Sequence, residues 1–207
     1  MTSFELNNNQ IESILCPICK NKSISSDLGL LKCQTCDHMY NENIHDDNYW
    51  NDLYENSYTQ NERKSNEQRN LMYKQDIQWI SKVKPLEGSF LDVGCSYGNL
   101  FSYLPSKIKK IGIDISTNVI NDAKKMHSNC EFYKTKICEF KPNEKFDFIQ
   151  FRGVIQHTNK PYQDLECAVS LLKKNGVIVI ESLPDFSSIT FKFFKEKIGF
   201  NSNNRGN

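Results

Sequence analysis

The sequence predicts an α/β fold in which a doubly wound, mostly parallel sheet follows a small metal-binding module. From about residue 85 onward, short apolar runs alternate with amphipathic segments, the pattern of strands and helices in such a sheet. Near the N-terminus, two Cys-x-x-Cys pairs lie close together. With 207 residues, the chain is long enough for one substantial core and a small additional module.

The composition gives the chain no general affinity for nucleic acid or anionic membranes, since the formal net charge is only +1. No apolar run approaches the roughly 20 residues that a membrane helix needs. The polar N-terminal residues do not resemble a signal peptide. We therefore expect a cytoplasmic protein without a membrane partner.

Residues 11–40 contain both cysteine pairs, separated by thirteen residues. The four thiols belong to Cys16, Cys19, Cys33 and Cys36. Pairs at this spacing are typical of a tetrahedral Zn²⁺ site, and disulfides are the alternative. A strand at Leu30–Lys32 leads into the second pair, which predicts a zinc ribbon whose metal stabilises the fold. We expect His38 to be a surface histidine, because four thiolates already complete such a site.

Residues 41–84 combine an aromatic-rich stretch with a helix. Trp50 and several tyrosines are set among Asn, Asp and Glu residues. This stretch is either a solvated linker whose rings pack on the domain surface, or a lid that closes over bound ligands. A helix is predicted from about Glu67, with Ile77 and Ile80 on the apolar face that packs on the following domain.

The central feature of the following domain is residues 89–100, which read as a buried strand, a glycine turn and the start of a helix. Gly94 and Gly98 permit backbone angles that are closed to other residues, so a ligand can approach the main chain at the end of the strand. A dinucleotide fingerprint requires glycine where this chain has Ser96 and Asn99. The pattern therefore disfavours a pyrophosphate ligand.

A second strand ends in Asp114, twenty positions after Gly94, where a carboxylate can accept hydrogen bonds from both ribose hydroxyls. Residues 91–98 and 112–116 resemble the first two motifs of class I S-adenosylmethionine-dependent methyltransferases, with Ser96 in place of the commoner middle glycine. The resemblance implies a Rossmann-like domain whose loop holds the methionine end of the cofactor and whose acid holds the ribose. The cofactor-binding residues that it implies are Asp92, Gly94, Cys95, Ser96, Tyr97, Gly98, Asp114 and Ile115.

The remaining elements of this domain, residues 85–207, continue the alternation. Apolar periodicity predicts helices at Leu100–Leu104, Val119–Met126, Tyr162–Leu172 and Ser187–Lys197, and strands at Glu131–Lys134, Phe146–Phe151 and Val177–Glu181. The turn Asn175-Gly176 is expected to close the third of these helices. The resemblance implies seven strands, whereas about five are found. We therefore expect a domain that is incomplete at its C-terminus, with an open sheet edge that leaves room for a partner chain.

The segment after the fourth strand is where the resemblance places both methyl donor and substrate. It ends in Gln156-His157 where the family commonly has Glu-His. His157 is a candidate proton acceptor, and a histidine that fixes the turn by hydrogen bonding is the alternative. Arg152 either reaches an anionic substrate or pairs with a surface acid. The acid that often receives the adenine amino group is absent from Thr135–Cys138.

The resemblance implies an enzyme that transfers a methyl group from S-adenosylmethionine to a small-molecule acceptor. A sugar or sugar-nucleotide is favoured, because similar proteins with a ribbon often serve surface-polysaccharide pathways. RNA is the alternative acceptor, although residues 1–48 carry three lysines against seven carboxylates, which disfavours phosphate binding. A truncated scaffold that binds cofactor without turnover is the third hypothesis.

Four cysteines lie outside the predicted ribbon. Cys95 belongs to the glycine loop, where its backbone matters more than its thiol. The others sit in predicted strands or helices and are expected to be buried or half-buried apolar residues. They are Cys130, Cys138 and Cys167.

Overall fold

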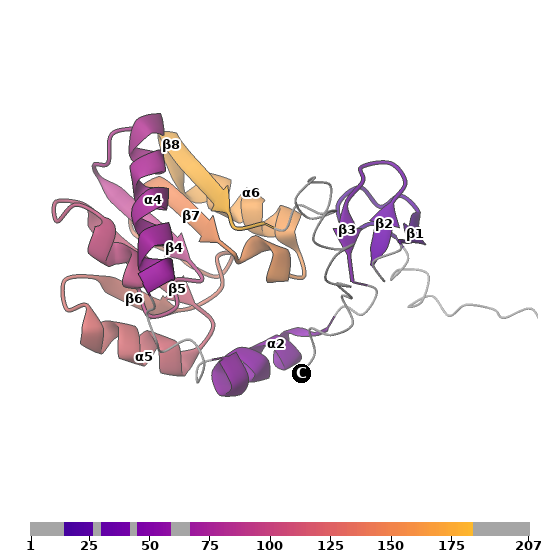
Figure 1. Cartoon of the computed structure of the whole chain (residues 1–207), viewed down its shortest axis with the longest axis horizontal. Coiled ribbons are helices and arrows are strands. Elements are labelled where there is room, and N and C mark those ends of the chain that lie inside the picture. The colour runs from indigo at the N-terminus through magenta and orange to yellow at the C-terminus, as the bar shows by residue number, and fades with distance from the viewer. Residues whose placement is uncertain (1–14, 27–29, 42–44, 59–66, 184–207) are drawn as a thin grey trace, which may run out of the picture. The chain divides into compact units, whose positions relative to one another are not determined.

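The computed structural model describes residues 15–26, 30–41, 45–58 and 67–183 (Figure 1). The chain forms two compact units that divide between His45 and Asp46. Residues 46–84, predicted as a linker or lid and a helix, therefore belong to the larger unit. The helix predicted at Ser187–Lys197 lies outside the described residues. No helix in the described part of the chain has the length and apolar character needed to cross a membrane.

The smaller unit contains a three-stranded antiparallel sheet in the order β1-β2-β3. Its strands are β1 (Ser23–Ser25), β2 (Leu31–Cys33) and β3 (Met39–Tyr40). The predicted strand at Leu30–Lys32 is thus confirmed with a shift of one residue. Since β2 ends at Cys33, this strand delivers the second cysteine pair to the turn that follows.

The larger unit contains a five-stranded sheet in the order β6-β5-β4-β7-β8, in which every neighbouring pair is parallel (Figure 1). Its strands are β4 (Ser89–Val93), β5 (Lys109–Asp114), β6 (Glu131–Lys134), β7 (Phe146–Arg152) and β8 (Leu172–Glu181). The chain moves outward from β4 to β6 and then returns to the other side of β4 with β7. This reversal confirms the doubly wound topology, in which ligands bind outside the carboxyl ends of the two strands where the order reverses, here β4 and β7.

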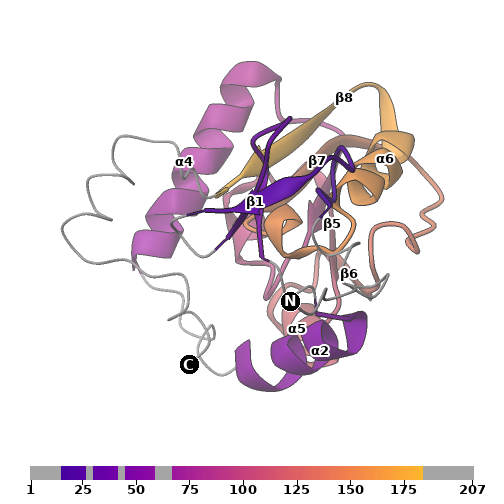
Figure 2. The same cartoon turned by 90° about the vertical axis from the view of Figure 1, so that its right-hand side faces the viewer.

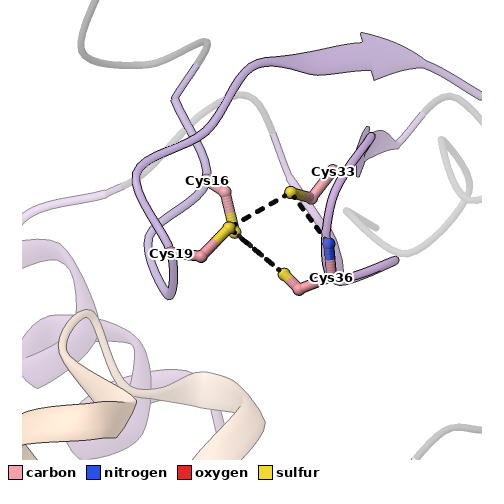
Figure 3. A group of neighbouring side chains, drawn as sticks. All are labelled: Cys16, Cys19, Cys33 and Cys36. Atoms are coloured by element: carbon pink, nitrogen blue, oxygen red, sulfur yellow. Dashed lines mark hydrogen bonds between the residues drawn. The ribbon is translucent and has the colours of Figure 1, made fainter.

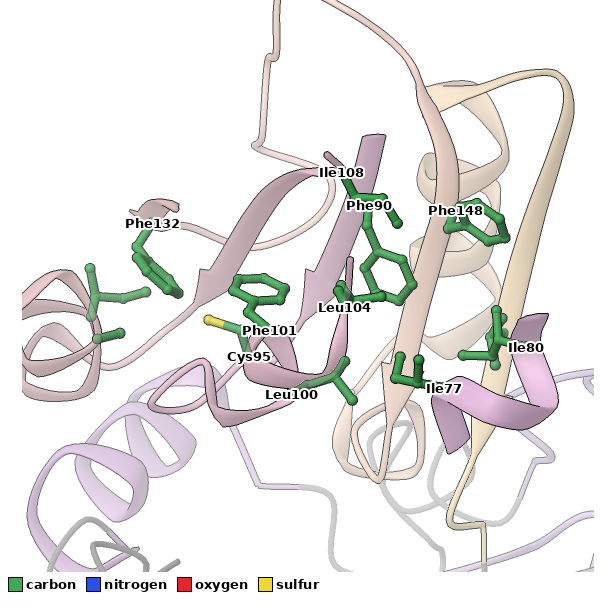
Figure 4. Packing of buried hydrophobic residues seen from close by; sticks show 13 residues of the cluster. Ile77, Ile80, Phe90, Cys95, Leu100, Phe101, Leu104, Ile108, Phe132 and Phe148 are labelled. Atoms are coloured by element: carbon green, nitrogen blue, oxygen red, sulfur yellow. The ribbon is translucent and has the colours of Figure 1, made fainter. Parts of the chain in front are cut away.

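Two hydrophobic cores cover the two faces of this sheet. Strand side chains alternate, so Phe90 and Phe148 face one core whereas Leu91 and Ile149 face the other. The helical elements of the unit are α2 (Asp47–Asp52), η1 (Leu53–Tyr58), α4 (Glu67–Val83), η2 (Asn99–Tyr103), α5 (Thr117–Met126), η3 (Ile155–His157) and α6 (Pro161–Leu171). Helices α4, η2 and α5 pack on the first face (Figure 4), and α6 packs on the second. The predicted apolar face of α4 is confirmed, because its Ile77 and Ile80 are buried.

The helix predicted after the glycine loop has the expected length, with its bounds shifted by one residue, but it is more tightly wound than an α-helix. Residues Asn99–Tyr103 form a 3₁₀ helix whose N-cap, Gly98, provides no side-chain hydrogen bond. A longer α-helix would need such a cap for its first N–H groups. Leu100, Phe101 and Leu104 are nevertheless buried, so the apolar pattern described the packing correctly and the helix type wrongly.

The prediction that Asn175-Gly176 closes a helix is wrong. Helix α6 ends at Leu171, and Gly176 lies inside β8. The pairing of β7 with β8 shifts register between Phe146 and Phe148. A Cβ on Gly176 would lie 2.9 Å from the carbonyl oxygen of Phe146, so glycine here permits a close approach between strands.

Cys138 and Cys167 form a disulfide, which corrects the expectation that both are simple apolar residues. The bond joins the turn after β6 to α6, and the two residues are 29 positions apart in the chain. Neither residue belongs to a recognisable cysteine spacing, so only the fold brings them together. Cys95 is buried, with 5% of its surface exposed, and Cys130 is partly buried, as expected.

Candidate functional site

The glycine loop folds back over the neighbouring strand β5. The backbone N–H groups of Gly94 and Cys95 donate to the carbonyl oxygen of Ile113, at 2.8 and 3.0 Å. Gly94 has φ +70°, and a Cβ at this position would lie 2.4 Å from Cγ2 of Val154. Gly98 has φ +71°, and a Cβ at this position would likewise overlap with the ring of Phe132. Both glycines are therefore required by the conformation of the loop and by its close neighbours.

Ser96 adopts a left-handed conformation with φ 49°, which explains why glycine is commoner at this place in similar proteins. Its backbone N–H donates to Oδ2 of Asp114 at 3.0 Å. The other oxygen of this carboxylate, Oδ1, accepts the N–H of Ser116 at 3.1 Å. Asp114 thus joins the glycine loop to the N-terminus of α5, where Ser116 is the N-cap residue.

Two acidic groups lie close together at this edge of the sheet. Burial raises the pKa of the Asp114 carboxyl, and the hydrogen bonds from Ser116 and Ser96 oppose that rise. Asp92 is almost fully buried, with 4% of its surface exposed, and this burial together with the charge of Asp114 raises its pKa to about 8. The raised pKa favours the protonated form of Asp92. This edge of the sheet therefore carries less negative charge than its two carboxyl groups suggest.

The structure brings the predicted cofactor residues to one edge of the sheet. Asp92 is the penultimate residue of β4, and the loop from Gly94 to Gly98 follows this strand. Asp114 ends the neighbouring strand β5, and Ile115 follows it. Within the loop, the side chains of Cys95 and Tyr97 are buried. This arrangement places a set of backbone groups and one partly exposed carboxylate around the carboxyl ends of two parallel strands.

His157 lies at the end of η3, where its backbone N–H donates to the carbonyl oxygen of Val154 at 2.8 Å. Its ring centroid lies 6.4 Å from that of Trp50 in α2. This contact places the imidazole at the same edge of the sheet as the glycine loop. Its role as a proton acceptor stays a prediction.

Arg152 pairs with an acid rather than projecting freely, which agrees with one of the two alternatives for it. Its Nε lies 2.7 Å from Oδ2 of Asp76 on α4, and its guanidinium covers the ring of Tyr73 at 4.9 Å. Glu181, at the end of β8, accepts a hydrogen bond from the buried amide of Gln150. Burial and the neighbouring Asp76 carboxyl raise the pKa of Glu181 to about 7. Sequence reasoning missed this polar cluster, because its members come from three separate elements.

Sequence reasoning also missed Glu55 in η1. Its Oε2 accepts the backbone N–H of Thr117, the first residue of α5, at 2.9 Å. The two residues are 62 positions apart, and no motif marks Glu55 in the sequence. Glu55 therefore attaches η1 to the start of α5, a placement that fits both alternatives, a linker packed on the domain surface and a lid.

In the smaller unit, the four predicted metal ligands gather in one place (Figure 3). All four sulfur atoms lie within 4.8 Å of one another, and the Cys19 sulfur is 3.4 Å from that of Cys33 and 3.5 Å from that of Cys36. Four thiolates around a tetrahedral Zn²⁺ would be separated by about 3.8 Å, given Zn–S bonds of about 2.3 Å. The donor set and its spacing therefore fit zinc. His38 is not part of the cluster and stacks on Tyr40, as expected of a histidine without a ligand role.

Comparisons with known proteins identify relatives of this chain. A family model described as a methyltransferase domain matches residues 87–197. An uncharacterized protein of Methanocaldococcus jannaschii is 30% identical over 130 residues, which cover 63% of this chain and 60% of that protein. A ubiquinone biosynthesis O-methyltransferase of Rhodopseudomonas palustris is 34% identical over 100 residues, which cover 45% of this chain and 39% of the enzyme.

Solved structures show the same fold for the larger unit. The structure of magnesium protoporphyrin IX methyltransferase from Synechocystis PCC 6803 with bound SAM matches with a TM-score of 0.54 at 16% identity, over 64% of this chain and 74% of that one. The chain spans 60% or less of the length of the two curated relatives named above.

Proposed function

Because the chain belongs to the methyltransferase-domain family, we propose that it transfers a methyl group from S-adenosylmethionine to a small-molecule acceptor. The observation that carries this proposal is the position of Asp114. This carboxylate lies at the end of β5, beside the glycine loop. Two backbone N–H groups donate hydrogen bonds to it and fix its orientation. A carboxylate oriented in this way retains lone pairs for the hydroxyls of a ribose.

The cofactor residues have separate roles in this proposal. The loop from Gly94 to Gly98 approaches the methionine end through its main chain, and Asp92 lies beneath it. Asp114 receives the ribose, and Ile115 flanks the adenosine. The turn Thr135–Cys138 supplies no acid for the adenine amino group, so adenine recognition depends on apolar contacts and backbone groups.

Methyl transfer requires little acid-base catalysis from the protein. The bound cofactor supplies an electrophilic methyl group on a sulfonium, and the acceptor displaces it directly. The residues of this chain orient the two reactants and exclude water from the site. His157 is the side chain that we propose as proton acceptor when the nucleophile is a hydroxyl or an amine.

A small-molecule acceptor is supported by the similarity to the ubiquinone biosynthesis O-methyltransferase. A sugar or sugar-nucleotide is our narrower proposal, and it rests on the combination of a ribbon with a methyltransferase domain. The surplus of carboxylates in residues 1–48 disfavours RNA as the acceptor. Among the described strands β8 stands at one edge of the sheet, and a partner chain pairing there stays a prediction.

We further propose that Cys16, Cys19, Cys33 and Cys36 bind one Zn²⁺ with a structural role. A unit of this size has too small an apolar core to fold on burial alone, so the metal contributes the missing free energy.

The cofactor proposal is tested by calorimetric titration of the whole chain with S-adenosylhomocysteine. The wild-type chain should bind, and Asp114→Ala should bind at least about tenfold more weakly, because a hydrogen bond to a charged group contributes about 1.5–3 kcal/mol. Asp122→Ala is the matched control, since Asp122 lies on α5 and its described ion pair is with Lys125 on the same helix. No binding by a folded wild-type chain would refute the cofactor, and equal binding by Asp114→Ala would refute the role of Asp114.

A further inference from the structure

Residues 47–58, which comprise α2 and η1, form a segment that we call the strap. Helix α2 has no buried residue and contributes no residue to either hydrophobic core, so the core does not hold it in place. Polar contacts instead connect the strap to three segments, each of which follows the carboxyl end of a different strand, β5, β6 or β7. Both views of the chain place α2 next to α5 at this end of the sheet (Figures 1 and 2).

The first contact lies beside the proposed ribose site. Glu55 accepts the N–H of Thr117, three residues after Asp114 in the chain. The Glu55 charge contributes to the raised pKa of Asp114, and burial with the charge of Asp114 raises the pKa of Tyr54 to about 12. Tyr54 and Glu55 therefore lie within electrostatic reach of Asp114.

The other two contacts fasten the N-terminal half of the strap. Asp47 pairs with Lys136, in the turn after β6, at 2.5 Å. The indole Nε1 of Trp50 donates to Oδ1 of Asn159, after β7, at 3.3 Å. The strap thus spans from the proposed ribose site to the segment that carries the proposed proton acceptor.

These contacts are of a kind that can break and re-form. Exposed ion pairs and single hydrogen bonds contribute little net stability, because each replaces contacts with water. The Asp47 and Lys136 side chains are 62% and 37% exposed, respectively. Because α2 has no buried residue and the contacts of the strap described above are of this kind, the segment can open at low cost, as a ligand-binding site enclosed by it would require.

We propose that the strap closes over the bound adenosyl cofactor, and that Glu55 is the positioning residue that fastens it to α5 beside Asp114. This inference rests on the proposed function. Glu55 acts through the strap, so its loss should accelerate the release of the cofactor and leave its entry almost unchanged. Its acceptor oxygen matters more than its charge, because its partner is a backbone N–H.

The chain offers a fluorescence signal for this experiment. It contains two tryptophans, Trp50 in the strap and Trp79 on α4, and Trp79 is 59% exposed. In a Trp79→Phe background, Trp50 is the only indole, and S-adenosylhomocysteine should change its emission. Stopped-flow mixing then gives the association and dissociation rate constants of this ligand directly.

Three variants in this background distinguish the loss of the Glu55 hydrogen bond from the loss of a negative charge in the strap. Glu55→Ala should raise the dissociation rate constant at least about fivefold and change the association rate constant less than about twofold. Glu55→Gln retains an acceptor oxygen and should stay within about threefold of the parent. Asp52→Ala removes the same charge from the same segment, where its described contact is with Asn56 in the strap itself, and should match the parent.

Lys136→Ala removes the second attachment and provides an independent test, with dissociation again expected to accelerate. If Glu55→Ala and Lys136→Ala both release S-adenosylhomocysteine at the rate of Asp52→Ala, the strap does not enclose the cofactor, and the inference is wrong while cofactor binding stands. If calorimetry detects no S-adenosylhomocysteine binding by the folded parent chain, the proposed function itself fails.

Discussion

Asp92 should make the stability of the folded chain fall as the pH rises from 5 to 7. Its carboxyl is almost fully buried beside Asp114, and its pKa is raised from 3.8 to about 8. In this pH window the folded chain keeps the Asp92 proton, whereas the unfolded chain has released it. The unfolded state therefore binds fewer protons, and stability decreases by about 1.4 kcal/mol per pH unit, or about 3 kcal/mol across the window.

Asp92→Asn removes this titration and keeps the shape of the side chain. Urea unfolding of the zinc-loaded chain, followed at pH 5, 6 and 7, gives the free energy of unfolding of each variant. The advantage of Asp92→Asn over wild type should grow by about 3 kcal/mol from pH 5 to pH 7. Since Glu181 and Asp114 titrate in both chains, their contributions largely cancel in this difference.

Asp52→Asn serves as the control for the loss of one carboxyl group, because Asp52 is an exposed acid on α2. A pH-independent difference between Asp92→Asn and wild type would refute the reasoning. It would mean that Asp92 is ionised in the folded chain and that a charge partner compensates its burial.

Two further predictions concern the metal site and the glycine loop. Cys33→Ser should reduce the zinc content, measured by atomic absorption after dialysis, from about one ion per chain to none. Calorimetry should still detect S-adenosylhomocysteine binding by this variant. Loss of zinc and of ligand binding together would contradict the separation into two units. Gly94→Ala should destabilise the chain by about 1–3 kcal/mol more than Gly153→Ala in urea unfolding, because both glycines have positive φ but only the Cβ at position 94 meets Val154, at 2.4 Å. Equal losses would show that the contact with Val154 relaxes freely.

The order of strands and helices could be predicted from the sequence, because it depends on local periodicity. The strand at Glu131–Lys134 has the predicted bounds, and β7 extends the predicted Phe146–Phe151 by one residue. The four ribbon cysteines were also predictable, since a metal-binding knuckle requires two thiols at a fixed short spacing. In the same way, Gly94 directly follows β4 and Asp114 ends β5, and parallel strands bring their carboxyl ends to one edge.

Contacts between distant residues were decided by the tertiary structure alone. The pairs Glu55 with Thr117, Arg152 with Asp76, and Cys138 with Cys167 join elements that carry no shared pattern in the sequence. The extent of β8 likewise depended on its neighbour β7, whose register shift draws Gly176 into the strand. Periodicity and spacing record which side of an element is apolar, whereas the partner of each polar side chain is set only when the elements pack.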